Sequence, residues 1–168
     1  MKLFAPLLIA VLSATLISGC SKKPAHGKPI SSESIIIEPG TSIGSVRSGM
    51  TMQQVQGLLG EPNRTMKGIL EYQNLGLIVL PAEGGLVGNV MCVDNNGHEP
   101  IKPFAGHTKE GIGIGSSRVQ VISAYGEPPT IERGRNYESL IYYQTRGMNF
   151  VIKNDKVSEM TVFLSRTN

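Results

Sequence analysis

Several short motifs contain residue types that could do chemistry, and each lacks part of the pattern that its chemistry needs. The glycine-rich Gly111–Gly115 could cradle a phosphate, but it lacks the Gly-Lys-Ser/Thr ending of a P-loop. Asp94–Glu99 offers oxygen ligands, but its glycine falls two positions early for an EF-hand calcium loop. No serine or cysteine nucleophile has a nearby histidine in a strand–turn–helix context. The motifs therefore predict neither a nucleotide site nor a catalytic site, and we expect the protein not to be an enzyme.

Two histidines are the remaining candidates for metal binding. His98 and His107 flank a polar connector and could hold a metal ion together with Glu99. Exposed linker histidines are the commoner interpretation of such a pattern, so we expect no metal and no cofactor. Metal analysis of the purified protein distinguishes the two interpretations.

The two cysteines have different expected roles. Cys92 lies in the apolar run Val90–Val93, which favours a buried small side chain over a nucleophile. Cys20 follows the apolar run Leu3–Ile17, which is preceded by a single lysine and is short for a membrane span. This arrangement has the form of a secretory signal.

Residues 16–20 (LISGC) resemble the bacterial lipobox, in which small residues precede a cysteine that is lipid-modified and becomes N-terminal. The resemblance implies a lipoprotein signal peptide over residues 1–19 and acylation of Cys20, palmitate included, as the membrane anchor. Ser21 at the next position is similar to lipoproteins sorted to the outer membrane. We therefore expect a lipid-anchored protein of the bacterial cell envelope, at the outer membrane and facing the periplasm. The alternative is an ordinary signal peptide with an incidental cysteine.

Length and composition suit one medium domain or two small ones. The chain has 168 residues, of which 40% are hydrophobic and 17% charged, with a net charge of +3. These values exclude a coiled coil, a collagen-like fibre and full disorder. Lys22, Lys23 and Lys28 alone equal the net positive charge, and they lie in residues 20–42, which we interpret as the lipidated cysteine and a flexible tether. The charge therefore does not indicate a nucleic-acid-binding face.

An internal repeat is the most informative feature of the chain. Residues 49–62 align with residues 115–128, each 66 positions after its counterpart, with six identities. Two further blocks recur in the same order: residues 70–77 with 141–148, and residues 87–93 with 157–163. The blocks predict a first repeat over 43–97, a connector over 98–108 and a second repeat over 109–168.

Each repeat contains the same order of expected elements. Thr51 and Ser117 are suited to N-cap a helix, and Gly60 and Gly126 to end it in a left-handed C-cap. Alternating apolar residues then predict three strands in each repeat: 70–73, 77–80 and 87–93 in the first, and 139–144, 148–153 and 157–164 in the second. The predicted fold class is α+β, with two tandem copies of a short helical segment followed by a three-stranded antiparallel β-meander.

The run Val46–Pro62, followed by Tyr72 and a meander, resembles the SmpA/OmlA (BamE-like) outer-membrane lipoprotein domain. Gly-Met-Thr at Gly49–Thr51, then Val55 and a Leu-Gly-x-Pro run, carry the resemblance, which the second repeat shows more weakly. Two such copies in tandem are also similar to the β-lactamase-inhibitor protein fold, in which they form a concave sheet. The resemblances imply non-catalytic protein binding, because single-domain members support outer-membrane protein assembly and the tandem inhibitor binds an enzyme.

The sequence therefore predicts a lipid-anchored envelope protein that acts as a non-catalytic interaction or scaffold module, with outer-membrane protein assembly as one role. The alternative is an inhibitor of a periplasmic or extracellular enzyme that acts through a concave two-repeat sheet. The expected partners are the membrane, through acylated Cys20, and an envelope protein.

The expected contact surface is the sheet face that the helices leave uncovered, or the loops at 74–76 and 145–147. Candidate partner-binding residues are aromatic and arginine side chains of the kinds that interfaces favour, namely Tyr72, Tyr142, Tyr143 and Arg146. Simple cross-strand packing is the alternative interpretation for Tyr72 and Tyr143.

Overall fold

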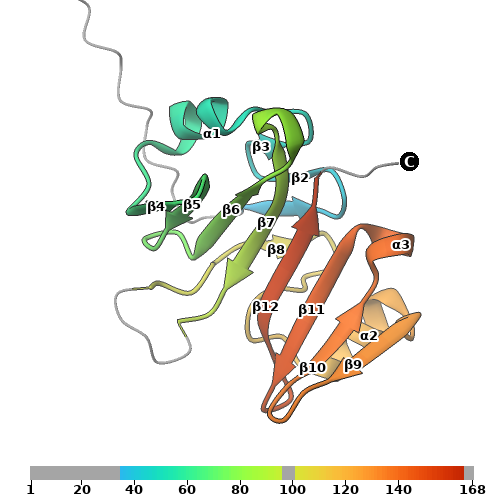
Figure 1. Cartoon of the computed structure of the whole chain (residues 1–168). Helices are drawn as coiled ribbons and strands as arrows, with labels where there is room; N and C mark the ends of the chain where they lie inside the picture. The colour runs from blue at the N-terminus through green and yellow to red at the C-terminus, as the bar shows by residue number, and fades with distance from the viewer. Residues whose placement is uncertain (1–34, 96–100, 165–168) are drawn as a thin grey trace, which may run out of the picture.

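The computed structural model describes residues 35–95 and 101–164, which form two β-sheets and short helices (Figure 1). The large sheet has eight antiparallel strands in the order β4-β5-β6-β7-β12-β11-β10-β9. Their bounds are β4 (Arg64–Met66), β5 (Ile69–Tyr72), β6 (Leu77–Pro81), β7 (Val87–Val93), β9 (Thr130–Arg133), β10 (Glu138–Ile141), β11 (Met148–Lys153) and β12 (Lys156–Phe163).

A small sheet and two helices cover one face of the large sheet. The small sheet has the order β3-β2-β1-β8, with bounds β1 (Ile36–Glu38), β2 (Ser42–Ile43), β3 (Val46–Arg47) and β8 (His107–Thr108). The helices are α1 (Met52–Leu59), α2 (Arg118–Tyr125) and α3 (Tyr143–Arg146), with a short 3₁₀ turn η1 (Glu83–Gly85). Ile37, Val55 and Val121 from this covering layer belong to the same buried cluster as Val90 and Phe150 of the large sheet.

The predicted fold class is wrong. The described residues form a mostly β protein with twelve strands in two sheets and three short helices, 18% helical, rather than two copies of a helix and a three-stranded meander. Each half of the large sheet contains a fourth strand, β4 or β9, which the sequence pattern did not indicate. Both strands lie at the outer edges of the sheet, and both are largely exposed and polar (RTM and TIER). They therefore lack the apolar alternation that marks a strand in a sequence.

Helices α1 and α2 begin with the same capping arrangement. The hydroxyl of Thr51 accepts a hydrogen bond from Gln54 N at 3.2 Å, while Gln54 Oε1 accepts one from Thr51 N at 2.9 Å. Ser117 and Gln120 repeat this pair at 3.2 and 2.8 Å. Two otherwise unpaired amides are thus satisfied at each helix start, and both predicted N-caps are confirmed.

Both helices end at glycine, in a conformation different from the expected one. Gly60 has φ 82° and ψ −167°, and Gly126 has φ 80° and ψ −177°. This region is essentially restricted to glycine, but it is extended rather than left-handed helical. The chain therefore leaves each helix directly toward the edge strand that follows, without the left-handed turn that the sequence suggested.

Strands β7 and β12 join the two halves of the large sheet at its centre. Met91 lies opposite Thr161 in the middle of this pairing, and the two residues are 70 positions apart in the sequence. Backbone hydrogen bonds close the pairing at both ends: Asp94 N donates to Ser158 O at 2.9 Å, and Leu164 N donates to Gly88 O at 2.8 Å. Leu164 lies 70 positions after Asp94, and Gly88 lies 70 positions before Ser158, so the two bonds are equivalent in the two halves. The halves are therefore related by an approximate twofold axis that passes between β7 and β12. We call this pairing of β7 with β12 the seam.

Neither α1, α2 nor any strand of the small sheet covers the other face of the large sheet, which α3 borders at one end. In Figure 1, α2 and β8 lie behind the orange and red strands β10–β12, and no helix lies in front of β11 and β12. We call this surface the open face. A single row of paired residues crosses all eight strands on it: Arg64, Glu71, Ile78, Met91, Thr161, Asn149, Ile141 and Thr130.

Two valines should differ sharply in how much they contribute to the free energy of unfolding. Val162 pairs with Val90 across the seam and is completely buried, whereas Val119 on α2 is 69% exposed. We expect Val162→Ala to lower the free energy of unfolding by about 1.5–3 kcal/mol, because the buried methyl groups are lost from the core. Val119→Ala should change the free energy of unfolding by less than about 0.5 kcal/mol. Urea unfolding followed by circular dichroism measures both; equal losses would contradict a core that runs through the seam.

Candidate interaction surface

Two of the four candidate partner-binding residues lie in the core. Tyr72 and Tyr142 are 3% and 2% exposed. The hydroxyl of Tyr72 donates to the carbonyl of Gly60 at 3.2 Å, and that of Tyr142 donates to the carbonyl of Gly126 at 2.6 Å. Each tyrosine therefore ties the end of a helix to the large sheet, and neither side chain presents a surface to a partner.

The other two candidates lie in α3 but face different parts of the molecule. Arg146 is exposed, with its guanidinium carbon 5.9 Å from the centre of the Tyr125 ring, on the side of α2. The ring of Tyr143 contacts that of Phe163 edge to face, with the centroids 4.6 Å apart. Phe163 pairs with Asn89 and shares the outward side of β12 with Thr161. Of the four candidates, Tyr143 is thus the one that borders the open face.

The open face is apolar over β6 and β7. Ile78, Leu80 and Met91 are partly exposed there, while their neighbours Leu77, Val79 and Val90 are buried on the covered side. Strands that are apolar on both faces are typical of sheets covered on both sides. The middle of this face therefore has the composition of a surface that packs against something else. The continuous apolar run of β6 was the sequence signal for it.

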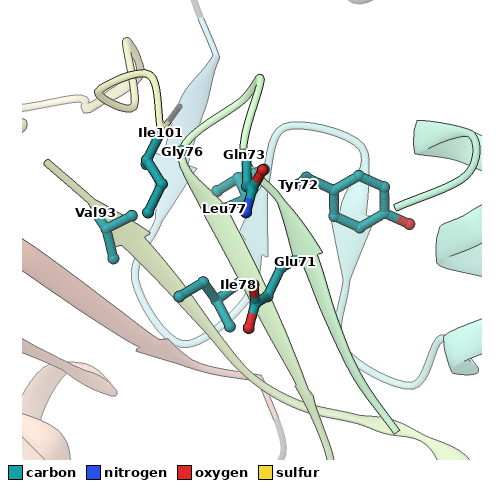
Figure 2. Close-up of a pocket in the computed structure, with 8 residues that line it drawn as sticks. All are labelled: Glu71, Tyr72, Gln73, Gly76, Leu77, Ile78, Val93 and Ile101. Atoms are coloured by element: carbon teal, nitrogen blue, oxygen red, sulfur yellow. The ribbon is translucent and has the colours of Figure 1, made fainter. Parts of the chain in front are cut away.

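A shallow depression lies beside this apolar region (Figure 2). Its volume is about 200 Å³, including space that is open to solvent. Glu71 and Ile78 point to the same side of the sheet, and Val93 and Ile101 lie at the opposite wall. Glu71, Ile78 and Val93 belong to the open face, so the depression is continuous with it.

The chain segment after residue 100 forms one wall of the depression and is held by main-chain bonds. Lys102 N donates to Gln73 O at 2.9 Å, and Phe104 N donates to Val93 O at 3.0 Å. Gly76 makes this close approach feasible, since a Cβ atom there would lie 2.5 Å from both Lys102 O and Phe104 N. The position of Ile101 is therefore fixed by the backbone.

Glu159 is a partly buried carboxylate on the open face. It lies opposite Val93 on β7 and opposite Val151 on β11. Burial raises the pKa of this carboxyl, while Lys153 and a 3.5 Å hydrogen bond from the Thr161 hydroxyl lower it by less. Within residues 35–95 and 101–164, the ion pairs are Arg64–Glu71, Lys109–Glu38 and those of Glu138 with Arg118 and Arg133, so Glu159 takes part in none.

Of the cysteines and histidines singled out from the sequence, Cys92 and His107 lie within the described residues. Cys92 is completely buried, and burial raises the pKa of its thiol, which confirms the prediction of an inert core residue. No group of three histidine, cysteine or carboxylate side chains in the described ranges could hold a metal. His107 is exposed, with Nδ1 2.9 Å from Thr108 O, whereas His98 and Glu99 lie outside the described residues.

The anchoring segment also falls outside the described part of the chain. Residues 1–34, including Cys20, belong to the ranges that the structure does not describe. None of the described helices has the length and apolar composition needed to cross a membrane. Searches against protein-family models, curated proteins and solved structures found no match to this chain.

The buried tyrosines give a prediction for alkaline pH. Burial raises the pKa of Tyr72 from 10.0 to about 12, so folding favours the neutral phenol. The stability that this group contributes is complete below pH 10 and is lost as the pH rises toward 12. We expect Tyr72→Phe to cost about 1 kcal/mol at pH 8, where the hydrogen bond to Gly60 is lost, and to lose less stability than the wild type between pH 10 and 12.

Urea midpoints measured at pH 8 and pH 11 test this expectation. Tyr137→Phe is the matched control, because Tyr137 is 48% exposed. An alkaline loss that is the same in Tyr72→Phe as in the wild type would show that Tyr72 does not contribute to it.

Proposed function

We propose that the protein is a lipid-anchored, non-catalytic interaction module of the bacterial envelope that binds an envelope protein through its open face. One observation carries the proposal. The eight hydrogen-bonded strands form a single open face, and no described element covers the apolar middle of that face. Outer-membrane protein assembly is the process in which we propose that it acts. The sequence supports a non-catalytic role because its chemical motifs are each incomplete.

The dimensions of the open face suit a protein partner. Eight strands at about 4.8 Å spacing span roughly 34 Å, a width comparable to the roughly 28 Å across a square patch of about 800 Å², the area that a standard interface buries on each side. The backbone of a paired sheet is already ordered, so binding costs less conformational entropy than it would for a mobile loop. These properties favour recognition of a folded surface.

The described chain begins on the side of the domain away from the open face. The described chain begins at Ile35 and passes directly into β1 of the small sheet, where Ile35 O accepts a hydrogen bond from His107 N at 3.0 Å. The small sheet packs on the covered side of the large sheet. The first described residue therefore lies on the side of the domain opposite to the proposed interface.

Site-specific photo-crosslinking in the bacterial host tests the interface. A photoreactive residue at Met91, at the centre of the open face, should give discrete covalent adducts with one or a few envelope proteins. The same residue at Val119, exposed on α2 in the covering layer, is the matched control and should give none. Adducts from Val119 but not from Met91 would contradict the proposed interface. If the Met91 adduct contained a hydrolase that this protein inhibits, the inhibitor role would replace the assembly role.

The anchor is tested separately. Cys20→Ser should abolish incorporation of an alkyne-labelled palmitate and release the protein into the soluble fraction. Cys92→Ala should keep the label, because Cys92 is buried in the core. Label that persists in Cys20→Ser would overturn the proposed acylation at this residue.

A further inference from the structure

We propose that the open face recognises a lysine or arginine side chain of the partner, whose aliphatic part lies in the depression beside β6 and β7 and whose charged group pairs with Glu159. This inference rests on the proposed function and specifies the chemistry of the partner. It follows from the position of Glu159, the apolar wall of the depression and the distribution of charge on the face.

Glu159 forms no ion pair within the described residues, and Lys153 lowers the pKa of its carboxyl by less than burial raises it. Valines lie opposite it on both neighbouring strands, and its described hydrogen bond is the 3.5 Å contact with Thr161. A carboxylate partly withdrawn from water is costly unless a cation pairs with it. A basic side chain from a partner supplies that cation and completes the removal of water.

The other carboxylates of the open face are placed differently from Glu159, and Lys153 forms no ion pair with it. Glu71 already pairs with Arg64 at 3.7 Å, at the β4 edge of the sheet. Glu132 lies on the opposite edge strand, β9, where its backbone is opposite Ser139 of β10. Lys153 is exposed at the end of β11 and forms no ion pair with Glu159 in the described structure. Among the described residues, the four central strands therefore present one carboxylate, that of Glu159, which takes part in no ion pair.

The depression lies within reach of the same group. Val93 lines the depression and also faces Glu159 across the seam. Directly paired residues on one sheet face have Cβ atoms about 5 Å apart, so a single long side chain can span both. Lysine and arginine place their methylene groups on apolar surface while their charged ends stay near water or a carboxylate. Ile78, Val93 and Ile101 supply that surface.

An NMR titration of the full chain in non-ionic detergent tests the inference. The probe is N-acetyl-lysine methylamide, and its uncharged match is N-acetyl-norleucine methylamide. We expect the lysine probe to shift the amide signals of Met91, Val93 and Glu159 and to bind about tenfold more tightly than the norleucine probe, as a charged hydrogen bond implies. Glu159→Gln should remove this preference, whereas Glu132→Gln on the edge strand should keep it.

Two outcomes would overturn the inference. One is equal binding of the lysine and norleucine probes to the wild type. The other is a lysine preference that survives in Glu159→Gln. A stability measurement adds a readout that a merely structural role would not give. At pH 7 the urea midpoint of Glu159→Gln should rise, because burial disfavours the ionised carboxylate and no described cation forms an ion pair with it. A fall in that midpoint would show that Glu159 stabilises the fold and would also overturn the inference.

The inference and the proposed function fail in different ways. If Met91 cross-links to an envelope protein but the lysine probe shows no preference that depends on Glu159, the interface stands and the basic side chain does not. If the lysine preference is present but Met91 gives no adduct in cells, the site for a basic side chain stands and the proposed envelope interface does not.

Discussion

The pairing of β7 with β12 is the constraint on which the rest of the structure depends. Each half taken alone is a four-stranded sheet with a long edge strand, β7 or β12, whose unpaired amides and carbonyls would invite association with other chains. Pairing these two edges with each other removes both and merges the two cores into one buried cluster. The edges that remain, β4 and β9, are short and polar, which discourages further strand addition.

The same seam creates a face with two different halves. On the first side, Ile78, Leu80 and Met91 give an apolar surface. On the second side, Thr161 lies opposite Met91 and is followed by Asn149, so the row is polar at these two positions before it reaches Ile141. The approximate twofold axis therefore relates the backbones and not the chemistry of the two sides.

Local features were predictable from the sequence and nonlocal ones were not. The caps at Thr51 and Ser117 and the burial of Cys92 depend on residues close in the chain. The assignment of Tyr72 to a surface depended on which side of its strand is covered. In the run Glu71-Tyr72-Gln73, alternation shows that Tyr72 faces away from its neighbours, but only the position of α1 decides which side is the core. Strand β4 was missed because pairing rather than burial holds it in the sheet.

The position of Glu159 also follows from the seam. In β12 the buried Val157, Met160 and Val162 face the core. An irregularity between Val151 and Ile152 of β11 shifts the strand register near Val157. Side chains alternate along a strand, so the register that buries Met160 turns Glu159 to the open face. A slip of one residue would place the carboxylate among the core side chains, where an unpaired charge is far more costly. The hydrogen bonds that join the two halves therefore also hold the proposed recognition group at the surface.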